Sequence, residues 1–272
     1  MMKLVTLALV ASFAATAALA DEPAPNWNLD GDLYLGTAVP ISSPESGAGV
    51  AMGGRANIRY ESTGRHVLIF GELQGEGFNN GGKSTDIQFS QFYLNTGLML
   101  GAKAVKWKTP LNVAVSRDIM TNEQIAVRFA FSGLYIKMLD ETAGEGQLHQ
   151  TLEAIADFVA EYISYRNEHV VNYNGNYVND RSILGLYAAI KYEIEKRGWG
   201  ATMQVDLLQD LSPSYTKING RLIGFKQLSG DLKNLRPYVE VAGTLDHDTM
   251  DPTGSLQGAL RVFAGISGRF GL

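Results

Sequence analysis

Histidines are the first residues to test for catalysis, because a neutral imidazole can act as a general base. The chain has four, His66, His149, His169 and His247. None has a serine partner at a recognisable spacing, and the sequence contains no G-x-S-x-G, H-E-x-x-H or P-loop pattern. Cysteine is absent, which excludes a thiolate nucleophile. We therefore predict no catalytic residue, no cofactor and no enzymatic activity.

A short acidic segment is the one candidate for metal binding. Asp246, His247 and Asp248 are followed by Asp251, and carboxylate oxygens are the ligands that Ca²⁺ prefers. The segment lacks the glycine-centred spacing of a calcium-binding loop. We therefore predict a solvated external loop and no metal site.

Charged residues that alternate with apolar residues are a stronger lead. Successive side chains of a strand point to opposite faces, so such charges collect on one face. If the strands close into a barrel, as the segments described below predict, these charges face its interior. There they would either line an aqueous pathway and set its ion selectivity, or pair with one another and fill a closed interior. The near balance of signs leaves both readings open. The predicted pore-lining residues are Arg55, Arg59, Glu72, Lys106, Lys108, Arg128, Arg221, Arg261 and Arg269.

Four of these residues predict a basic wall. Arg55 and Arg59 lie on the second expected strand, and Arg261 and Arg269 lie on the last. Closing a barrel brings both strands next to the first one. Such a wall would favour anionic solutes.

Long alternating segments must position these charges. In residues 199–207, for example, Trp199, Met203 and Val205 share one parity, whereas Gln204 and Asp206 share the other. The expected strands are about 12 to 17 residues long, against about 5–6 for an ordinary strand and about 9–11 for one that crosses a membrane. A shift of parity near Gln91 predicts a β-bulge there.

Composition excludes several classes of protein. The chain has 272 residues, a net charge of −5 and 45% hydrophobic residues, with no cysteine. A disulfide scaffold is impossible without cysteine. The acidic balance argues against nucleic acid as a partner, and the apolar content is too high for a disordered chain.

The first twenty residues have the form of a secretory signal peptide. Lys3 supplies the positive charge, an apolar run follows, and Ala18-Leu19-Ala20 is a small-x-small cleavage site. We predict a signal peptide over 1–20 and one domain, a barrel, over 21–272.

The segment 147–166 is ambiguous. Leu148, Leu152, Ile155 and Val159 have helical spacing, and helix propensity is high. As a strand, the same segment completes an even count of twelve and returns the C-terminus to the side of the N-terminus. We predict a strand, with a helix that plugs the lumen or lies at its mouth as the alternative.

The whole mature chain resembles a Gram-negative outer-membrane β-barrel. The signal peptide that ends at Ala20 and the final segment, residues 256–272, carry this resemblance. The latter is similar to the C-terminal signal that the barrel-assembly machinery reads, with Phe270 near the end, although the last residue is Leu272 rather than an aromatic one. Aromatic residues of the apolar parity gather at strand ends, as in a lipid-facing girdle. They are Trp27, Tyr60, Trp107, Tyr192, Trp199 and Phe270.

These features predict an all-β fold, a single closed antiparallel transmembrane barrel of about twelve strands. The expected location is the outer membrane, with its lipid as a partner and the barrel-assembly machinery as a partner during biogenesis. The expected function is a small passive diffusion channel with a charged lumen and a preference for anionic solutes. The alternative is a closed structural barrel that binds a partner through its external loops.

Overall fold

The computed structural model describes residues 27–41, 48–62, 66–79, 88–102, 104–110, 112–118, 124–142, 148–165, 170–171, 177–212, 214–250 and 256–271. The predicted signal peptide lies outside these ranges. The strands are β1 (Trp27–Pro40), β2 (Gly49–Glu61), β3 (Val67–Asn79), β4 (Gln88–Gly101), β5 (Val105–Lys108), β6 (Asn112–Asp118), β7 (Gln124–Thr142), β8 (His149–Tyr165), β9 (Val170–Val171), β10 (Tyr177–Val178), β11 (Asp180–Lys196), β12 (Trp199–Asp210), β13 (Tyr215–Lys226), β14 (Leu235–Asp248) and β15 (Gln257–Gly271). One 3-10 turn, η1 (Gly230–Leu232), precedes β14.

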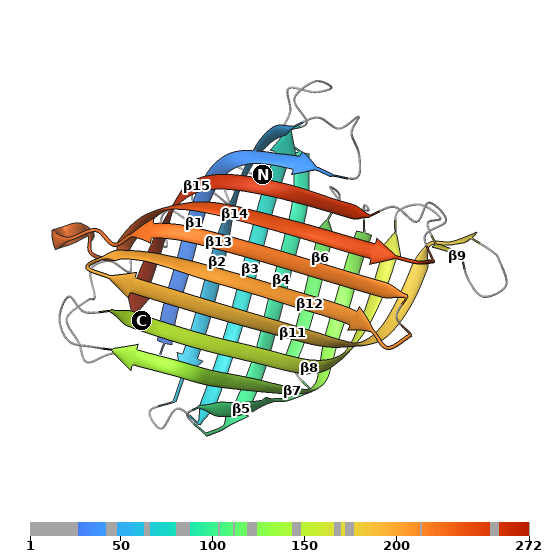
Figure 1. Cartoon of the computed structure of the whole chain (residues 1–272), viewed down its shortest axis with the longest axis horizontal. Helices are drawn as coiled ribbons and strands as arrows, with labels where there is room; N and C mark the ends of the chain where they lie inside the picture. Colours follow the sequence, from blue (N-terminus) through green and yellow to red (C-terminus); the bar gives the residue numbers. More distant parts are fainter. Residues whose placement is uncertain are drawn as a thin grey trace.

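The strands close into one antiparallel barrel. The main sheet has thirteen strands, and β5 and β6 both pair with β4 and β7, so they share one position and the barrel has twelve. Pairing of β1 with β15 joins the first strand to the last along thirteen residue pairs. In Figure 1 the near strands cross those behind at a steep angle, as tilted strands of a barrel do. The predicted fold class is confirmed.

The outer face of the barrel is apolar. Large hydrophobic side chains are exposed at alternate positions, for example Leu35 (54%), Leu222 (54%) and Ile266 (55%). Similar residues are exposed on β1 to β5, β7, β8 and β11 to β15. An apolar surface of this extent is unfavourable in water and suits the hydrocarbon of a bilayer.

Connections differ between the two ends of the barrel. We call the end where β1, β3, β8, β12 and β14 begin the turn end, and the opposite end the loop end. At the turn end, Arg197 and Gly198 alone join β11 to β12, with φ angles of 53° and 77°. These positive φ angles define a two-residue hairpin turn that matches the twist of the strands. Figure 1 shows the small β9–β10 hairpin at the loop end.

The ambiguous segment is a strand. β8 pairs with β7 on one side and with β11 on the other, from His149 to Tyr165. Partners on both sides satisfy its backbone N–H and C=O groups, and this outweighs its helix propensity. Within the described ranges, no helix is long and apolar enough to cross a membrane.

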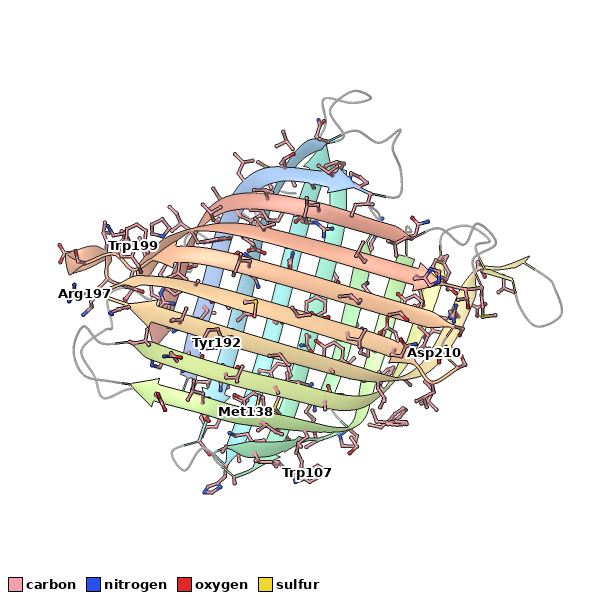
Figure 2. The ribbon with its side chains drawn as sticks, in the orientation of Figure 1. Trp107, Met138, Tyr192, Arg197, Trp199 and Asp210 are labelled. Atoms are coloured by element: carbon pink, nitrogen blue, oxygen red, sulfur yellow. The ribbon has the colours of Figure 1, made fainter. Side chains whose placement is uncertain are left out.

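Four irregularities interrupt the regular ladder. The register between β3 and β4 shifts at Glu76/Gly77 and skips Ser90, which places the bulge next to the predicted position at Gln91. β7 skips Phe131 and Met138 against β8, and Figure 2 labels Met138 on the near wall. The fifth barrel position breaks between Lys108 and Asn112, a break that the sequence did not predict.

Aromatic rings fill part of the interior by lying over glycines. An added Cβ on Gly53 would come within 2.6 Å of the Tyr34 hydroxyl, and one on Gly265 within 2.7 Å of the Tyr238 ring. The absence of a side chain at these positions lets each ring lie flat against the inner wall. Tyr34, Tyr238, Phe225 and Phe263 form one buried cluster there.

Candidate functional site: the charged lumen

A cluster of ion pairs crosses one side of the lumen. Arg55 of β2 places its Nε 2.8 Å from an oxygen of Asp32 and its Nη2 2.7 Å from an oxygen of Glu240. β2 and β14 are not neighbours in the sheet, so the contact with Glu240 runs across the interior. The Tyr238 hydroxyl accepts a further hydrogen bond from Arg55 at 3.0 Å, and the Tyr34 ring lies 5.0 Å from the guanidinium carbon.

Two more arginines extend this network. Arg221 Nε lies 2.8 Å from Glu240, so that Glu240 bridges two guanidinium groups. Arg261 Nε lies 3.4 Å from Glu76, which also accepts a hydrogen bond from the Tyr34 hydroxyl at 3.2 Å. We call this set the arginine cluster: Asp32, Tyr34, Arg55, Glu76, Arg221, Tyr238, Glu240 and Arg261. Each buried charge of the cluster has at least one partner of opposite sign, as a charge removed from water requires.

A second buried network lies at the loop end. Arg181 of β11 contacts Asp248, and its Nη2 donates to Ser214 at 2.6 Å. The Tyr215 hydroxyl donates to Asp246 at 3.0 Å. Asp246 and Asp248 are therefore inward-facing residues of β14 that are almost fully buried. The prediction of a solvated loop is wrong for these two residues, because β14 extends to Asp248; Asp251 lies outside the described ranges.

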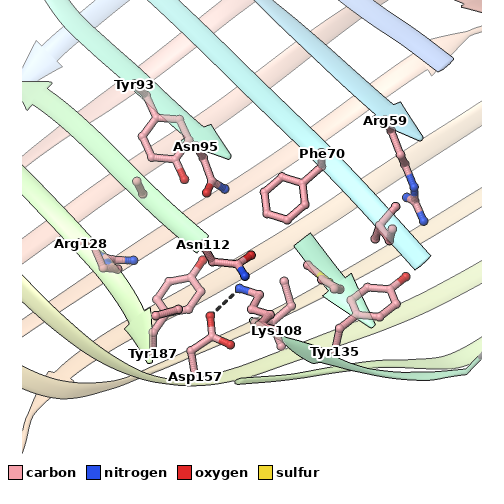
Figure 3. A pocket seen from close by; sticks show the side chains of 15 residues that line it. Arg59, Phe70, Tyr93, Asn95, Lys108, Asn112, Arg128, Tyr135, Asp157 and Tyr187 are labelled. Carbon is pink, nitrogen blue, oxygen red and sulfur yellow. Dashed lines mark hydrogen bonds and ion pairs between the residues drawn. The ribbon is translucent and has the colours of Figure 1, made fainter. Parts of the chain in front are cut away.

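A cavity lies beside the break between β5 and β6. It has a volume of about 220 Å³ and is lined from β2 to β8 and from β11. Figure 3 shows Lys108 and Asp157 directed toward each other across its floor, with Nζ and Oδ2 2.5 Å apart. Arg128 lies 2.5 Å from Glu161 and over the Tyr187 ring at 4.7 Å. We call this space the break cavity.

Asn112 forms hydrogen bonds across the strand break and to β4. Its Nδ2 donates to the carbonyl oxygens of Leu98 at 3.0 Å and Thr109 at 2.6 Å, and its backbone N–H donates to Thr109 at 3.2 Å. These bonds give the Thr109 carbonyl oxygen two donors, and the Leu98 carbonyl oxygen also accepts from the Thr109 backbone N–H at 3.0 Å. Lys108 and Asn112 share the inner parity on either side of the break, and both line the cavity.

Two smaller cavities adjoin the arginine cluster. One of about 150 Å³ is lined by Arg221, Glu240 and Arg261, and one of about 110 Å³ by Asp32, Arg55 and Tyr238. The charged lumen therefore contains separate spaces for water or small solutes, with ion pairs between them.

The structure places the predicted pore-lining residues in different surroundings. Arg59, Lys108 and Arg128 line the break cavity. Arg55, Arg221 and Arg261 belong to the arginine cluster, so Arg55 and Arg261 do not form a free basic wall. Lys106 is buried, 3.5 Å from Glu61 and 5.5 Å from the Tyr135 ring. Glu72 is a half-buried residue of β3.

Arg59 and Arg269 are the accessible members of the predicted wall. Both lie near the turn end, with side chains 36% and 54% exposed. Arg269 Nε lies 2.7 Å from Asp30, and Arg59 Nη2 lies 3.7 Å from Glu61. These pairs form a charged mouth, because β1, β2 and β15 all reach this end.

The aromatic residues of the predicted girdle lie in three settings. Trp107 and Trp199 are 61% and 63% exposed, and Figure 2 labels them on the outside of the barrel. Trp27 packs against Tyr60 with ring centroids 4.9 Å apart, and the Tyr192 hydroxyl donates to Gln150 at 2.8 Å. Phe270 is only 5% exposed, because its ring covers Gly268.

Sequence reasoning missed Arg181 and Tyr238. Arg181 is the second residue of β11 and shares the inner parity of Tyr187. Tyr238 has the inner parity of β14. Its function as a partner of Arg55 depends on a contact between residues 183 positions apart.

No family model matches this chain, and no curated protein matches it either. Among solved structures, it is similar to the NanC porin, with 8% identity over 88% of this chain and 98% of that chain and a TM-score of 0.45. It is also similar to the KdgM porin, with 9% identity, the same coverages and a TM-score of 0.38. The translocator domain of the autotransporter NalP from Neisseria meningitidis has 8% identity, coverages of 98% and 97%, and a TM-score of 0.39. At these scores the likenesses carry no argument about function.

Proposed function

We propose that this chain is a passive diffusion channel of the Gram-negative outer membrane, which passes small polar solutes through a lumen narrowed by ion pairs. The observation that carries the proposal is the contrast between the two faces of one closed sheet. The outer face exposes rows of leucine, valine and isoleucine, whereas the inner face carries charges and cavities large enough for several water molecules. A bilayer requires the first feature, and an aqueous pathway requires the second.

The proposed selectivity is a modest preference for anions, set at the turn end. Arg59 and Arg269 are two accessible cations of the mouth. Their partners Glu61 and Asp30 offset part of this charge, so the preference is expected to be small. The arginines of the arginine cluster contribute less, because carboxylates already neutralise them.

A closed structural barrel is the second candidate. The ion pairs and the buried aromatic cluster occupy much of the space between the cavities. In that case the chain would act through its loops. In either case, we propose that β15 is the strand that the barrel-assembly machinery reads.

Conductance in a planar lipid bilayer separates the two candidates. The chain without residues 1–20 would be refolded in detergent and added to the bilayer in asymmetric KCl. Discrete current steps are expected, with a reversal potential on the anion-selective side. Absence of steps from a protein shown to be folded and inserted would overturn the channel and support the closed barrel.

Matched variants at the mouth test the origin of the selectivity. Arg59→Gln/Arg269→Gln is expected to shift the reversal potential toward cation selectivity, and Asp30→Asn/Glu61→Gln to shift it the other way. All four side chains lie at the same rim, so pore size changes little between the two pairs. Equal shifts in one direction would contradict a mouth that selects by charge.

A further inference from the structure

One part of the turn end carries lysines on the outside of the barrel. Strand register places Lys196 of β11 opposite Trp199 of β12, and Trp199 opposite Lys226 of β13. All three have the parity of the outward apolar residues, such as Ile190 and Leu222. They therefore form one row across three neighbouring strands, which we call the lysine–tryptophan row.

The geometry of the row is that of two cations beside an aromatic ring. Directly opposed residues of antiparallel strands have their Cβ atoms about 4.5–5.5 Å apart. Lys226 Nζ lies 4.7 Å from the centroid of the Trp199 ring, and Trp199 is 63% exposed. Figure 2 shows Trp199 and the adjacent Arg197 projecting from the end of the barrel.

The lysines of the row have no carboxylate of their own. In the part of the chain that the structure describes, neither Lys196 nor Lys226 belongs to an ion pair. The acidic residues of the same hairpin face the other way. Glu195 lies 3.7 Å from Arg236 and Glu193 lies 3.8 Å from Lys191, both on the inner parity. The outer rim at this point therefore carries a net positive charge.

A second rim tryptophan provides an internal comparison. Trp107 is 61% exposed at the same end of the barrel, and its strand partners are Leu100 and Leu134. An exposed tryptophan at a membrane interface requires no lysines beside it. The two lysines at Trp199 are thus a separate feature with a separate role.

We propose that the lysine–tryptophan row binds the phosphate headgroup of an anionic phospholipid in the leaflet at the turn end. Charge complementarity and position carry this proposal: two unpaired ammonium groups lie at the edge of the apolar outer face, where a headgroup lies when acyl chains cover that face. Both lysines donate to phosphate oxygens, and the indole packs against the headgroup. The inference rests on the membrane location in the proposed function, but not on conduction.

Titration with a defined lipid tests the site. Phosphatidylglycerol would be added to the chain without residues 1–20, refolded in neutral detergent, and phosphatidylcholine, which has no net charge, would be added in a parallel sample. Native mass spectrometry would count the bound lipids. We expect one phosphatidylglycerol that is retained in preference to phosphatidylcholine. Lys196→Gln/Lys226→Gln is expected to weaken its binding about 30-fold, and raising the salt concentration should weaken binding to the unmodified chain.

Two matched controls keep the test specific. Arg197→Asn/Lys233→Gln removes the same charge from the same rim without changing the row, and asparagine tolerates the positive φ of Arg197. Trp199→Leu is expected to weaken binding, whereas Trp107→Leu should leave it unchanged. Equal losses in the two charge variants, or no preference for phosphatidylglycerol, would overturn the site.

Failure of this inference is distinguishable from failure of the proposed function. A chain that does not insert into lipid vesicles would refute the membrane location itself. A chain that inserts and conducts but shows no lipid preference would refute the lysine–tryptophan row alone.

Discussion

The arginine cluster and the break cavity are built from the same types of residue but differ in how the charges are shared. In the arginine cluster, Arg55 contacts two carboxylates and a tyrosine hydroxyl, and Glu240 contacts two arginines. At the break cavity the pairs are one to one, Lys108 with Asp157 and Arg128 with Glu161. Shared partners make a dense network, and single pairs leave room for a cavity of about 220 Å³.

Backbone regularity accounts for part of this difference. Most strands that carry the arginine cluster pair without interruption, from β2 through β1, β15 and β14 to β13. The exception is β3, whose register against β4 shifts at Glu76/Gly77. The break cavity borders the one barrel position that is divided into two short strands. The arginine cluster is thus the densely paired side of the lumen, and the side with the divided strand holds the break cavity.

The largest expected effect is loss of the central guanidinium. Arg55→Leu leaves Asp32 and Glu240 without their main partner in a buried setting. Removal of one member of a buried ion pair costs about 3–5 kcal/mol. We expect the free energy of unfolding to fall by this amount, as measured by urea denaturation of the refolded barrel in detergent. A loss below about 1 kcal/mol would mean that the network does not stabilise this side.

The matched change at the cavity should cost less. Lys108→Met leaves only Asp157 without its partner, and the adjacent cavity can admit water to that carboxylate. We expect a loss of about 1–3 kcal/mol in the free energy of unfolding. The same denaturation experiment checks it. A cost equal to that of Arg55→Leu would remove the energetic distinction between the two sides.

Removal of a single tyrosine hydroxyl from each side of the lumen should give the smallest changes in stability. Tyr238→Phe loses the hydrogen bond from Arg55 and should cost about 1 kcal/mol. The Tyr187 hydroxyl has no hydrogen bond to any described residue, so Tyr187→Phe should change stability by less than about 0.5 kcal/mol. Thermal unfolding of both variants in one detergent would show the difference. The reverse order would contradict the assigned roles.

Local pattern was sufficient for most strands. Period-two alternation over Trp199, Met203 and Val205 predicts a strand with one lipid-facing side, and β12 has that form. The parity shift near Gln91 indicated the bulge at Ser90. Segment 147–166 could not be decided by propensity. The even strand count indicated the correct answer, because the first and last strands of an antiparallel barrel can pair antiparallel only if the number of strands is even.

The break at residues 109–111 could not be predicted from alternation. Val105, Trp107, Val113 and Val115 keep one parity across it, so the pattern continues although the strand does not. Pro110 within the break has no backbone N–H to pair, and Asn112 bonds to Leu98 of β4 and to Thr109. Alternation of apolar and polar residues indicates which face of the sheet a side chain occupies. It does not indicate whether the backbone of that residue forms hydrogen bonds with a neighbouring strand.

The sequence by itself determined the barrel, its lipid-facing side and the set of charged residues inside it, because side-chain parity in a strand is a local property. Only the tertiary structure decided which of those charges are neutralised. Arg55 meets Glu240 across the lumen, 185 positions away, and that contact depends on the curvature and closure of the whole sheet. The same closure placed Lys196, Trp199 and Lys226 in one row on the outer rim.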